Sequence, residues 1–135
     1  MFVDDLQLAY INELSKDPHN FGTLDAPSMS HEDNNPLCGD RIRIDLQVHD
    51  GVITDVRFKG RGCSISQASA SLLTDEIKGM QVEAAKQFKK EELLDLIGIP
   101  LDRSPVRLKC ALLSLKVLKA GLYGVGSREI DDEDL

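Results

Sequence analysis

The chain has 135 residues, with 16 Lys or Arg against 23 Asp or Glu, so its formal net charge is −7. This length fits a single core, the acidic balance argues against nucleic acid as a partner, and no apolar run is long enough to span a membrane. We therefore expect a cytoplasmic protein with one domain over residues 1–127 and an acidic, disordered tail over residues 128–135.

The three cysteines cannot form a complete disulfide framework, because three is an odd number. In a reducing compartment, dispersed thiols serve metal binding or chemistry, or they are small buried hydrophobic side chains. The spacing and surroundings of Cys38, Cys63 and Cys110 have to decide between these alternatives.

The first predicted element is a helix over residues 3–15, whose inward side carries apolar residues at helical spacing: Leu6, Tyr10, Ile11 and Leu14. Residues 17–37 follow, rich in Asp, Asn, Ser, His and Pro and without periodicity. This composition predicts a long mobile connection that leads to Cys38.

Strict alternation of apolar and polar residues between Asp40 and Lys59 predicts two antiparallel strands. Matching their apolar faces pairs Val48 with Val52 and leaves a three-residue loop, residues 49–51, with Gly51 in the left-handed conformation. The same pairing, extended to the open end, sets Cys38 opposite Gly62 and beside Cys63. Two thiols distant in sequence are thus expected to be neighbours.

Four helices are predicted after the hairpin. The first starts directly after Cys63, with Ser64 and Gln67 at capping-box spacing, and ends at Gly79. Two short helices cover residues 82–86 and 89–97, and the last runs from Ser104-Pro105 to Gly124 and carries Cys110. We expect an α+β fold with a small antiparallel sheet, about three strands, and helices packed mainly on one face.

The three cysteines and one aspartate suit a tetrahedral metal ion, which takes four donors. Cys38 and Asp40 point the same way in an extended segment, Cys63 lies at a strand-to-helix junction, and Cys110 lies on the last helix. Zinc and iron both accept this ligand set. Arg107 shares a helical face with Cys110 and can hold a departing thiolate or the Asp40 carboxylate; the alternative is an ordinary solvent-exposed arginine.

Three motifs resemble one known family: N-P-L-C-G-D, then V-R-F-K-G-R-G-C-S-I-S-Q-A-S-A-S, then S-P-V-R-L-K-C. They look like the iron-sulfur cluster assembly family that includes IscU, the amino-terminal domain of NifU, and SufU. The resemblance covers nearly all of residues 5–123. Lys109 stands where IscU-type scaffolds carry a histidine, and the residues after Cys63 are similar to the SufU branch.

The resemblance implies an IscU/NifU-like fold and zinc held by Cys38, Asp40, Cys63 and Cys110. It further implies sulfur transfer from a SufS-type cysteine desulfurase to Cys38, with Arg107 as a functional residue, and a downstream SUF scaffold or apo-protein as acceptor. On that interpretation the chain is a zinc-dependent sulfurtransferase. The alternatives are a non-enzymatic scaffold that assembles a transient [2Fe-2S] cluster on the same residues, and a structural zinc-binding interaction module.

Overall fold

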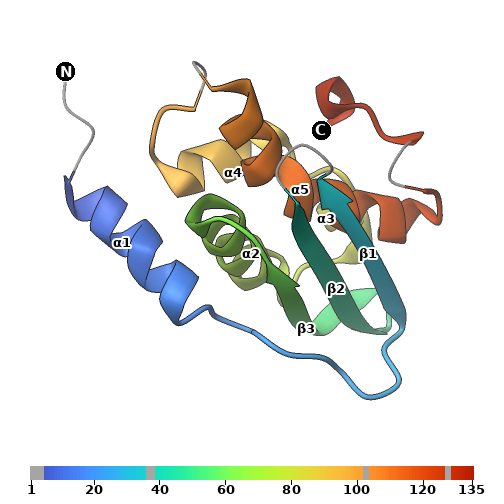
Figure 1. Ribbon diagram of the computed structural model, residues 1–135. Helices are drawn as coiled ribbons and strands as arrows, with labels where there is room; N and C mark the ends of the chain where they lie inside the picture. The colour runs from blue at the N-terminus through green and yellow to red at the C-terminus, as the bar shows by residue number, and fades with distance from the viewer. Residues whose placement is uncertain (1–4, 36–38, 102–103, 127–128) are drawn as a thin grey trace.

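The computed structural model describes residues 5–35, 39–101, 104–126 and 129–135 (Figure 1). The elements, in chain order, are α1 (Asp5–Lys16), β1 (Met29–Asn35), β2 (Asp40–His49), β3 (Val52–Arg61), α2 (Ser64–Ile77), α3 (Val82–Lys86), α4 (Lys90–Ile97), α5 (Pro105–Tyr123) and the short 3-10 helix η2 (Asp132–Asp134). No helix in these described ranges is both long and apolar enough to cross a bilayer.

A three-stranded antiparallel sheet in the order β1-β2-β3 carries the helices on one of its faces (Figure 1). Helix α5 packs on β1 and β2, helix α2 packs on β3, and α1 lies against α2. Among the described residues, the buried core is aliphatic apart from Phe58 and Phe88, and its largest fully buried members include Ile42, Ile44, Leu46, Leu73, Leu115 and Leu118. The predicted α+β fold with helices on one face is confirmed.

Close packing of α2 on α5 follows from the small side chains in the first half of α2. Ala68, Ser69 and Ala70 are fully buried, and the Ser69 hydroxyl donates to the backbone carbonyl of Ala111 at 2.5 Å. A hydroxyl can reach a carbonyl of the facing helix only when the two backbones approach closely. This contact fixes α5, and with it Cys110, relative to the start of α2.

The predicted register of the β2–β3 hairpin is wrong. A two-residue turn joins His49 to Val52, with positive φ at both Asp50 (52°) and Gly51 (77°), as in the turn that Asp-Gly favours in hairpins. A bulge at Thr54 then inserts one extra residue, so that Leu46 pairs with Val56. A two-residue turn without a bulge would set apolar residues of one strand against charged residues of the other. The bulge removes this mismatch, because it returns the apolar residues to one face. Gly51 does adopt the predicted left-handed conformation.

The segment predicted as a long connection contains an unpredicted strand, β1. Its sequence, M-S-H-E-D-N-N, is polar, but its backbone pairs with β2 from Met29–Leu46 to Asn35–Asp40. The backbone hydrogen bonds and the cover that α5 provides on one face support a strand without an apolar pattern. This strand brings Asn35 beside Asp40.

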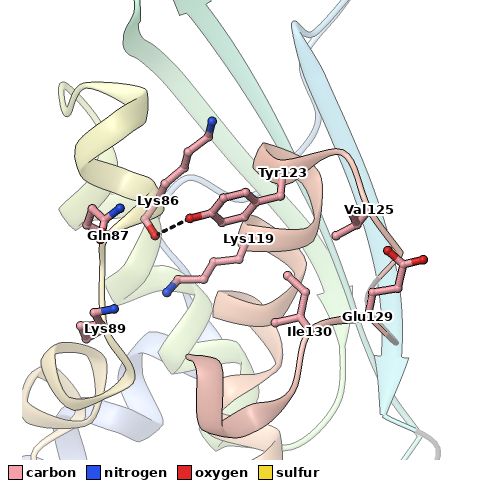
Figure 2. Close-up of a pocket in the computed structure, with 8 residues that line it drawn as sticks. All are labelled: Lys86, Gln87, Lys89, Lys119, Tyr123, Val125, Glu129 and Ile130. Carbon is pink, nitrogen blue, oxygen red and sulfur yellow. Dashed lines mark hydrogen bonds between the residues drawn. The ribbon is translucent and has the colours of Figure 1, made fainter.

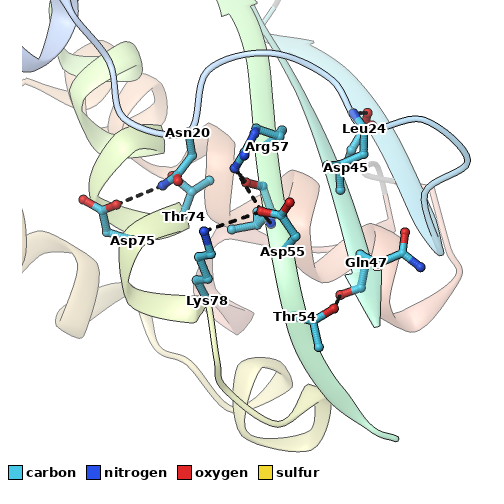
Figure 3. A network of polar contacts seen from close by, with 11 residues as sticks. Asn20, Leu24, Asp45, Gln47, Thr54, Asp55, Arg57, Thr74, Asp75 and Lys78 are labelled. Atoms are coloured by element: carbon cyan, nitrogen blue, oxygen red, sulfur yellow. Dashed lines mark hydrogen bonds and ion pairs between the residues drawn. The ribbon is translucent and has the colours of Figure 1, made fainter. Parts of the chain in front are cut away.

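The rest of that connection crosses the sheet face opposite the helices. Residues 20–22 bond to the free edge of β3, through Phe58 N–H to Asn20 O and Gly22 N–H to Phe58 O, both 2.8 Å. Further along, the Leu24 N–H donates to the Asp45 carboxylate at 3.0 Å (Figure 3). Asp45 is therefore buried on a face that the strand pattern alone assigns to solvent.

Three further expectations differ from the structure. Leu6 (80% exposed) and Tyr10 (43%) lie on the outside of α1, so only Ile11 and Leu14 face inward. The N-cap of α2 is Cys63 without a side-chain cap, so the Ser64–Gln67 capping box is absent. The described part of the acidic tail is not disordered: it forms η2 and buries Leu135.

Candidate metal centre

Three side chains that suit a metal ion meet at one edge of the molecule. Asp40 begins β2, Cys63 caps α2 directly after β3, and Cys110 lies in the second turn of α5. One carboxylate oxygen and the two sulfurs all lie within 4.8 Å of one another. Donors around one tetrahedral zinc ion lie roughly 3.5–4 Å apart, as its bond lengths of about 2.0–2.3 Å require. The three groups therefore fit a shared ion after small side-chain adjustments.

Asp40 is held in place by the turn that leads into α2. One carboxylate oxygen accepts the backbone N–H of Cys63 at 3.1 Å, and the other lies 3.5 Å from the Cys63 sulfur. Gly62 makes this approach possible, because a Cβ at that position would overlap the Asp40 carboxylate. The carboxylate is only 2% exposed, so its position is set by the fold rather than by solvent.

Cys110 sits in a buried environment with an amide donor next to its sulfur. It is 2% exposed, and Asn35 Nδ2 donates to its Sγ at 3.8 Å. Asn35 is itself buried, 6% exposed, and pairs across the sheet with Asp40. Asn35 was missed as a site residue in the sequence, although it is the first letter of N-P-L-C-G-D; only its pairing in β1 reveals the contact with α5.

The three described donors differ in their exposure to solvent. Cys63 is exposed whereas Cys110 and Asp40 are buried, so a partner reaches the centre from the side of Cys63. As the N-cap residue, Cys63 lies at the start of α2, next to its first backbone N–H groups. An exposed sulfur and two buried donors are the arrangement that an exchangeable centre needs.

Cys38, the remaining predicted ligand, lies outside the described residues. In the observed register Arg41 pairs with Arg61, and the Asp40 carboxylate lies against Gly62. In sequence, Cys38 stands between Asn35 and Asp40, two residues that pair with each other. Asp40 and Cys63 are the neighbours that the open end of the hairpin brings together.

Arg107 lies on α5 one turn before Cys110 and is exposed. Its backbone N–H bonds to the Ser104 hydroxyl at 3.4 Å, which caps the helix. Within the described part of the chain, its guanidinium forms no ion pair. The structure thus places Arg107 at the end of α5 that carries Cys110 without bringing its charge onto Asp40.

Comparison with known proteins agrees with the geometry. Residues 9–131 match the NifU-like N terminal domain family. The chain is 37% identical to the zinc-dependent sulfurtransferase SufU of Bacillus subtilis, with 89% of this chain and 91% of that protein covered. It is also 37% identical to the iron-sulfur cluster assembly scaffold protein IscU of Rickettsia prowazekii, with 88% and 91% covered.

Among solved structures, one similar to this chain is described as a putative iron-sulfur cluster assembly scaffold protein for the SUF system from Fervidobacterium islandicum. Its TM-score is 0.71 at 28% identity, with 84% of this chain and 93% of that chain covered. The fold, the convergence of Asp40, Cys63 and Cys110, and these matches lead to one conclusion. The chain belongs to the NifU-like N-terminal domain family, which includes the SufU and IscU iron-sulfur cluster assembly proteins.

Proposed function

We propose that this chain is a zinc-bound sulfur acceptor in iron-sulfur cluster assembly. The observation that carries the proposal is the meeting of Asp40, Cys63 and Cys110, drawn from three separate elements, within 4.8 Å. Cys38, two residues before Asp40, would complete a set of three thiolates and one carboxylate. The SufU relative, named a zinc-dependent sulfurtransferase, supports this interpretation.

The donor set suits zinc, which would keep the thiolates deprotonated and protected without redox chemistry of its own. A carboxylate is a weaker donor to zinc than a thiolate, and Asp40 already has the Cys63 N–H as a hydrogen-bond partner. Asp40 would therefore be the weaker of the ligands that hold zinc, and it would keep the Cys63 N–H as a hydrogen-bond partner when it does not bind the ion. Such a shell is easier to open than one of four thiolates.

Sulfur transfer to Cys38 is a thiol–persulfide exchange. The Cys38 thiolate attacks the terminal sulfur of a persulfide on a SufS-type cysteine desulfurase, the sulfur–sulfur bond of that persulfide breaks, and the desulfurase cysteine leaves as a thiolate. Cys38 then carries the persulfide: its sulfur is oxidised, the desulfurase cysteine is reduced to the same extent, and no external oxidant or reductant is needed. On this proposal Arg107, exposed on α5 one turn before Cys110, would offer its guanidinium to a thiolate as it arrives or leaves.

The proposal is tested by incubating purified protein with a SufS-type cysteine desulfurase and cysteine. We expect stoichiometric zinc, faster desulfurase turnover, and a mass increase of one sulfur atom on the peptide that contains Cys38. Cys38→Ala should lower turnover to that of the desulfurase alone, whereas the surface control Asp95→Asn should behave as wild type. Sulfur transfer at the normal rate to Cys38→Ala would show that the assigned acceptor is wrong.

A second function, a scaffold for a [2Fe-2S] cluster on the same residues, is favoured by the identity to IscU scaffolds. Thiolate and carboxylate donors accept iron as well as zinc. Desulfurase-dependent growth of an iron–sulfur absorption spectrum on the purified protein, without zinc, would identify the scaffold. Bound zinc with neither activity would leave a structural zinc-binding interaction module.

A further inference from the structure

The Asp132 carboxylate joins the acidic tail to α5. Asp132 contacts two lysines of α5, Lys109 at 3.0 Å and Lys116 at 3.1 Å. These lysines are seven positions apart, so they lie two turns apart on the same side of the helix. Lys90 at the start of α4 adds a third contact, from its Nζ to the Asp132 carbonyl at 3.2 Å. Figure 1 shows the tail folded back beside α5.

Helix α5 is unusual in this acidic protein because it carries no acidic residue. Its sequence, PVRLKCALLSLKVLKAGLY, holds four basic residues and no carboxylate, although the whole chain has a formal charge of −7. In the tail, by contrast, five of the seven residues from Glu129 to Leu135 are acidic. The tail therefore covers a basic stripe with a segment of opposite charge.

The contact between tail and helix is partly open to solvent. A pocket of about 350 Å³ lies beside this contact, between the end of α3 and the segment after it, α5 and the tail; Lys119 and Tyr123 line it from α5, and Glu129 and Ile130 from the tail (Figure 2). The ion pairs are partly solvated, with exposed fractions of 47% for Lys109, 25% for Lys116 and 33% for Asp132. Ion pairs at such sites contribute little each. Leu135, which is buried, anchors the end of the segment.

The basic stripe, Lys109 and Lys116, starts in the same turn of α5 as Cys110, because Lys109 directly precedes Cys110 in the chain. A protein that delivers sulfur to the centre has to approach this end of α5. We propose that Lys109 and Lys116 form a docking surface for an acidic segment of the cysteine desulfurase, and that residues 129–135 occupy this surface in the free protein. The identity of the partner rests on the proposed function; the surface itself rests on the tail contacts.

The test compares two variants that remove the same charge from adjacent positions. Asp132→Asn breaks the contacts to both lysines, whereas Asp131→Asn changes an exposed carboxylate next to it. Binding of each zinc-loaded full-length variant to the desulfurase is measured by calorimetry at low salt. We expect Asp132→Asn to bind about fivefold more tightly than wild type, the gain from releasing one partly solvated ion-pair network. Asp131→Asn should remain within about twofold.

Two further measurements test the docking surface independently of the identity of its partner. A synthetic peptide with the sequence of residues 129–135, EIDDEDL, should bind Asp132→Asn more tightly than wild type and compete with the desulfurase. In a background that carries both Lys109→Gln and Lys116→Gln, Asp132→Asn should no longer change the affinity. Heparin binding to Asp132→Asn as tight as peptide binding would indicate a general polyanion site and overturn the proposal.

The outcomes also separate this proposal from the proposed function. Equal desulfurase affinity for Asp132→Asn and Asp131→Asn would overturn the docking surface while leaving sulfur transfer to Cys38 intact. No desulfurase binding by any variant, with the peptide result as expected, would retain an acidic-segment surface but exclude the desulfurase as its partner, and would count against the proposed function.

Discussion

At the scale of single residues, the centre depends on neighbours that contribute no ligand. Gly62 leaves room for the Asp40 carboxylate, and the Cys63 N–H fixes its orientation. Asn35 donates its side-chain N–H to the buried sulfur of Cys110. Amide donors to a thiolate draw electron density from the sulfur, so they change how strongly it binds a metal ion and how readily it reacts.

Replacing Asn35 should therefore change the electronic properties of the centre. In protein loaded with cobalt in place of zinc, Asn35→Ala should shift the sulfur-to-cobalt charge-transfer band to lower energy, because the sulfur lone pair is no longer stabilised by the N–H at 3.8 Å. Asn34→Ala, an exposed neighbour on the same strand, is the control. An unchanged band in Asn35→Ala with correctly folded protein would mean that the amide only fills space.

At the scale of elements, the helices and their ends could be predicted and the sheet only in part. Pro105 with Ser104 marks the start of α5, and Gly98 and Gly124 mark helix ends in the left-handed conformation, because such caps are local chemistry. The hairpin strands were predicted too, but their register depends on the bulge at Thr54, which no alternation pattern contains. Strand β1 is polar and forms through pairing with β2, so its sequence carries no signal.

The site, like the sheet, was predicted only in part. Asp40, Cys63 and Cys110 were recognised from residue chemistry and are brought together by the fold. Asn35 was not, because its contact with Cys110 spans 75 positions and requires β1. Asp132 was placed in a disordered tail, since composition cannot show that its carboxylate meets two lysines of α5. Long-range polar contacts of this kind are set by tertiary structure alone.

On the outer face of the sheet, the Asp45 carboxylate of β2 holds β1 and the connection that leads to it. Its carboxylate accepts from Ser30 at 2.6 Å, from Arg43 at 2.9 Å and from the Leu24 N–H at 3.0 Å, and its side chain is 1% exposed. Burial alone would raise the pKa of Asp45, but these hydrogen bonds outweigh burial and hold the pKa below its ordinary value of 3.8.

Asp45→Asn should therefore lower the free energy of unfolding of the metal-free protein by about 2–3 kcal/mol at pH 7. Because the folded-state pKa is depressed, the stabilisation is complete above about pH 4 and is lost as the pH falls through the folded-state pKa. The difference in free energy of unfolding between wild type and Asp45→Asn, measured in urea, should thus become smaller in acid. Asp95→Asn, an exposed control, should cost less than about 0.5 kcal/mol at either pH. A gap that stays constant in acid would contradict this role.

At the scale of the whole molecule, the centre joins parts of the fold that are distant in sequence. Asp40 comes from the sheet, Cys63 from the junction of β3 with α2, and Cys110 from α5. An ion that binds all three stabilises only the folded chain, since these ligands are scattered in the unfolded one. Metal binding is therefore coupled to the packing of α2 and α5 on the sheet.

Removing zinc with a chelator should lower the thermal midpoint measured by calorimetry. Free zinc at about 100 times its dissociation constant stabilises the folded state by about 2.7 kcal/mol, which is roughly 10 °C for a chain of this size. One variant at an exposed ligand and one at a buried ligand distinguish the loss of metal binding from the loss of packing. Cys63→Ser, at an exposed sulfur, should abolish most of the zinc-dependent rise and leave the metal-free midpoint close to wild type. Cys110→Ser should also lower the metal-free midpoint, because it buries a hydroxyl in place of a thiol. A full zinc-dependent rise in both variants would show that the ion binds elsewhere.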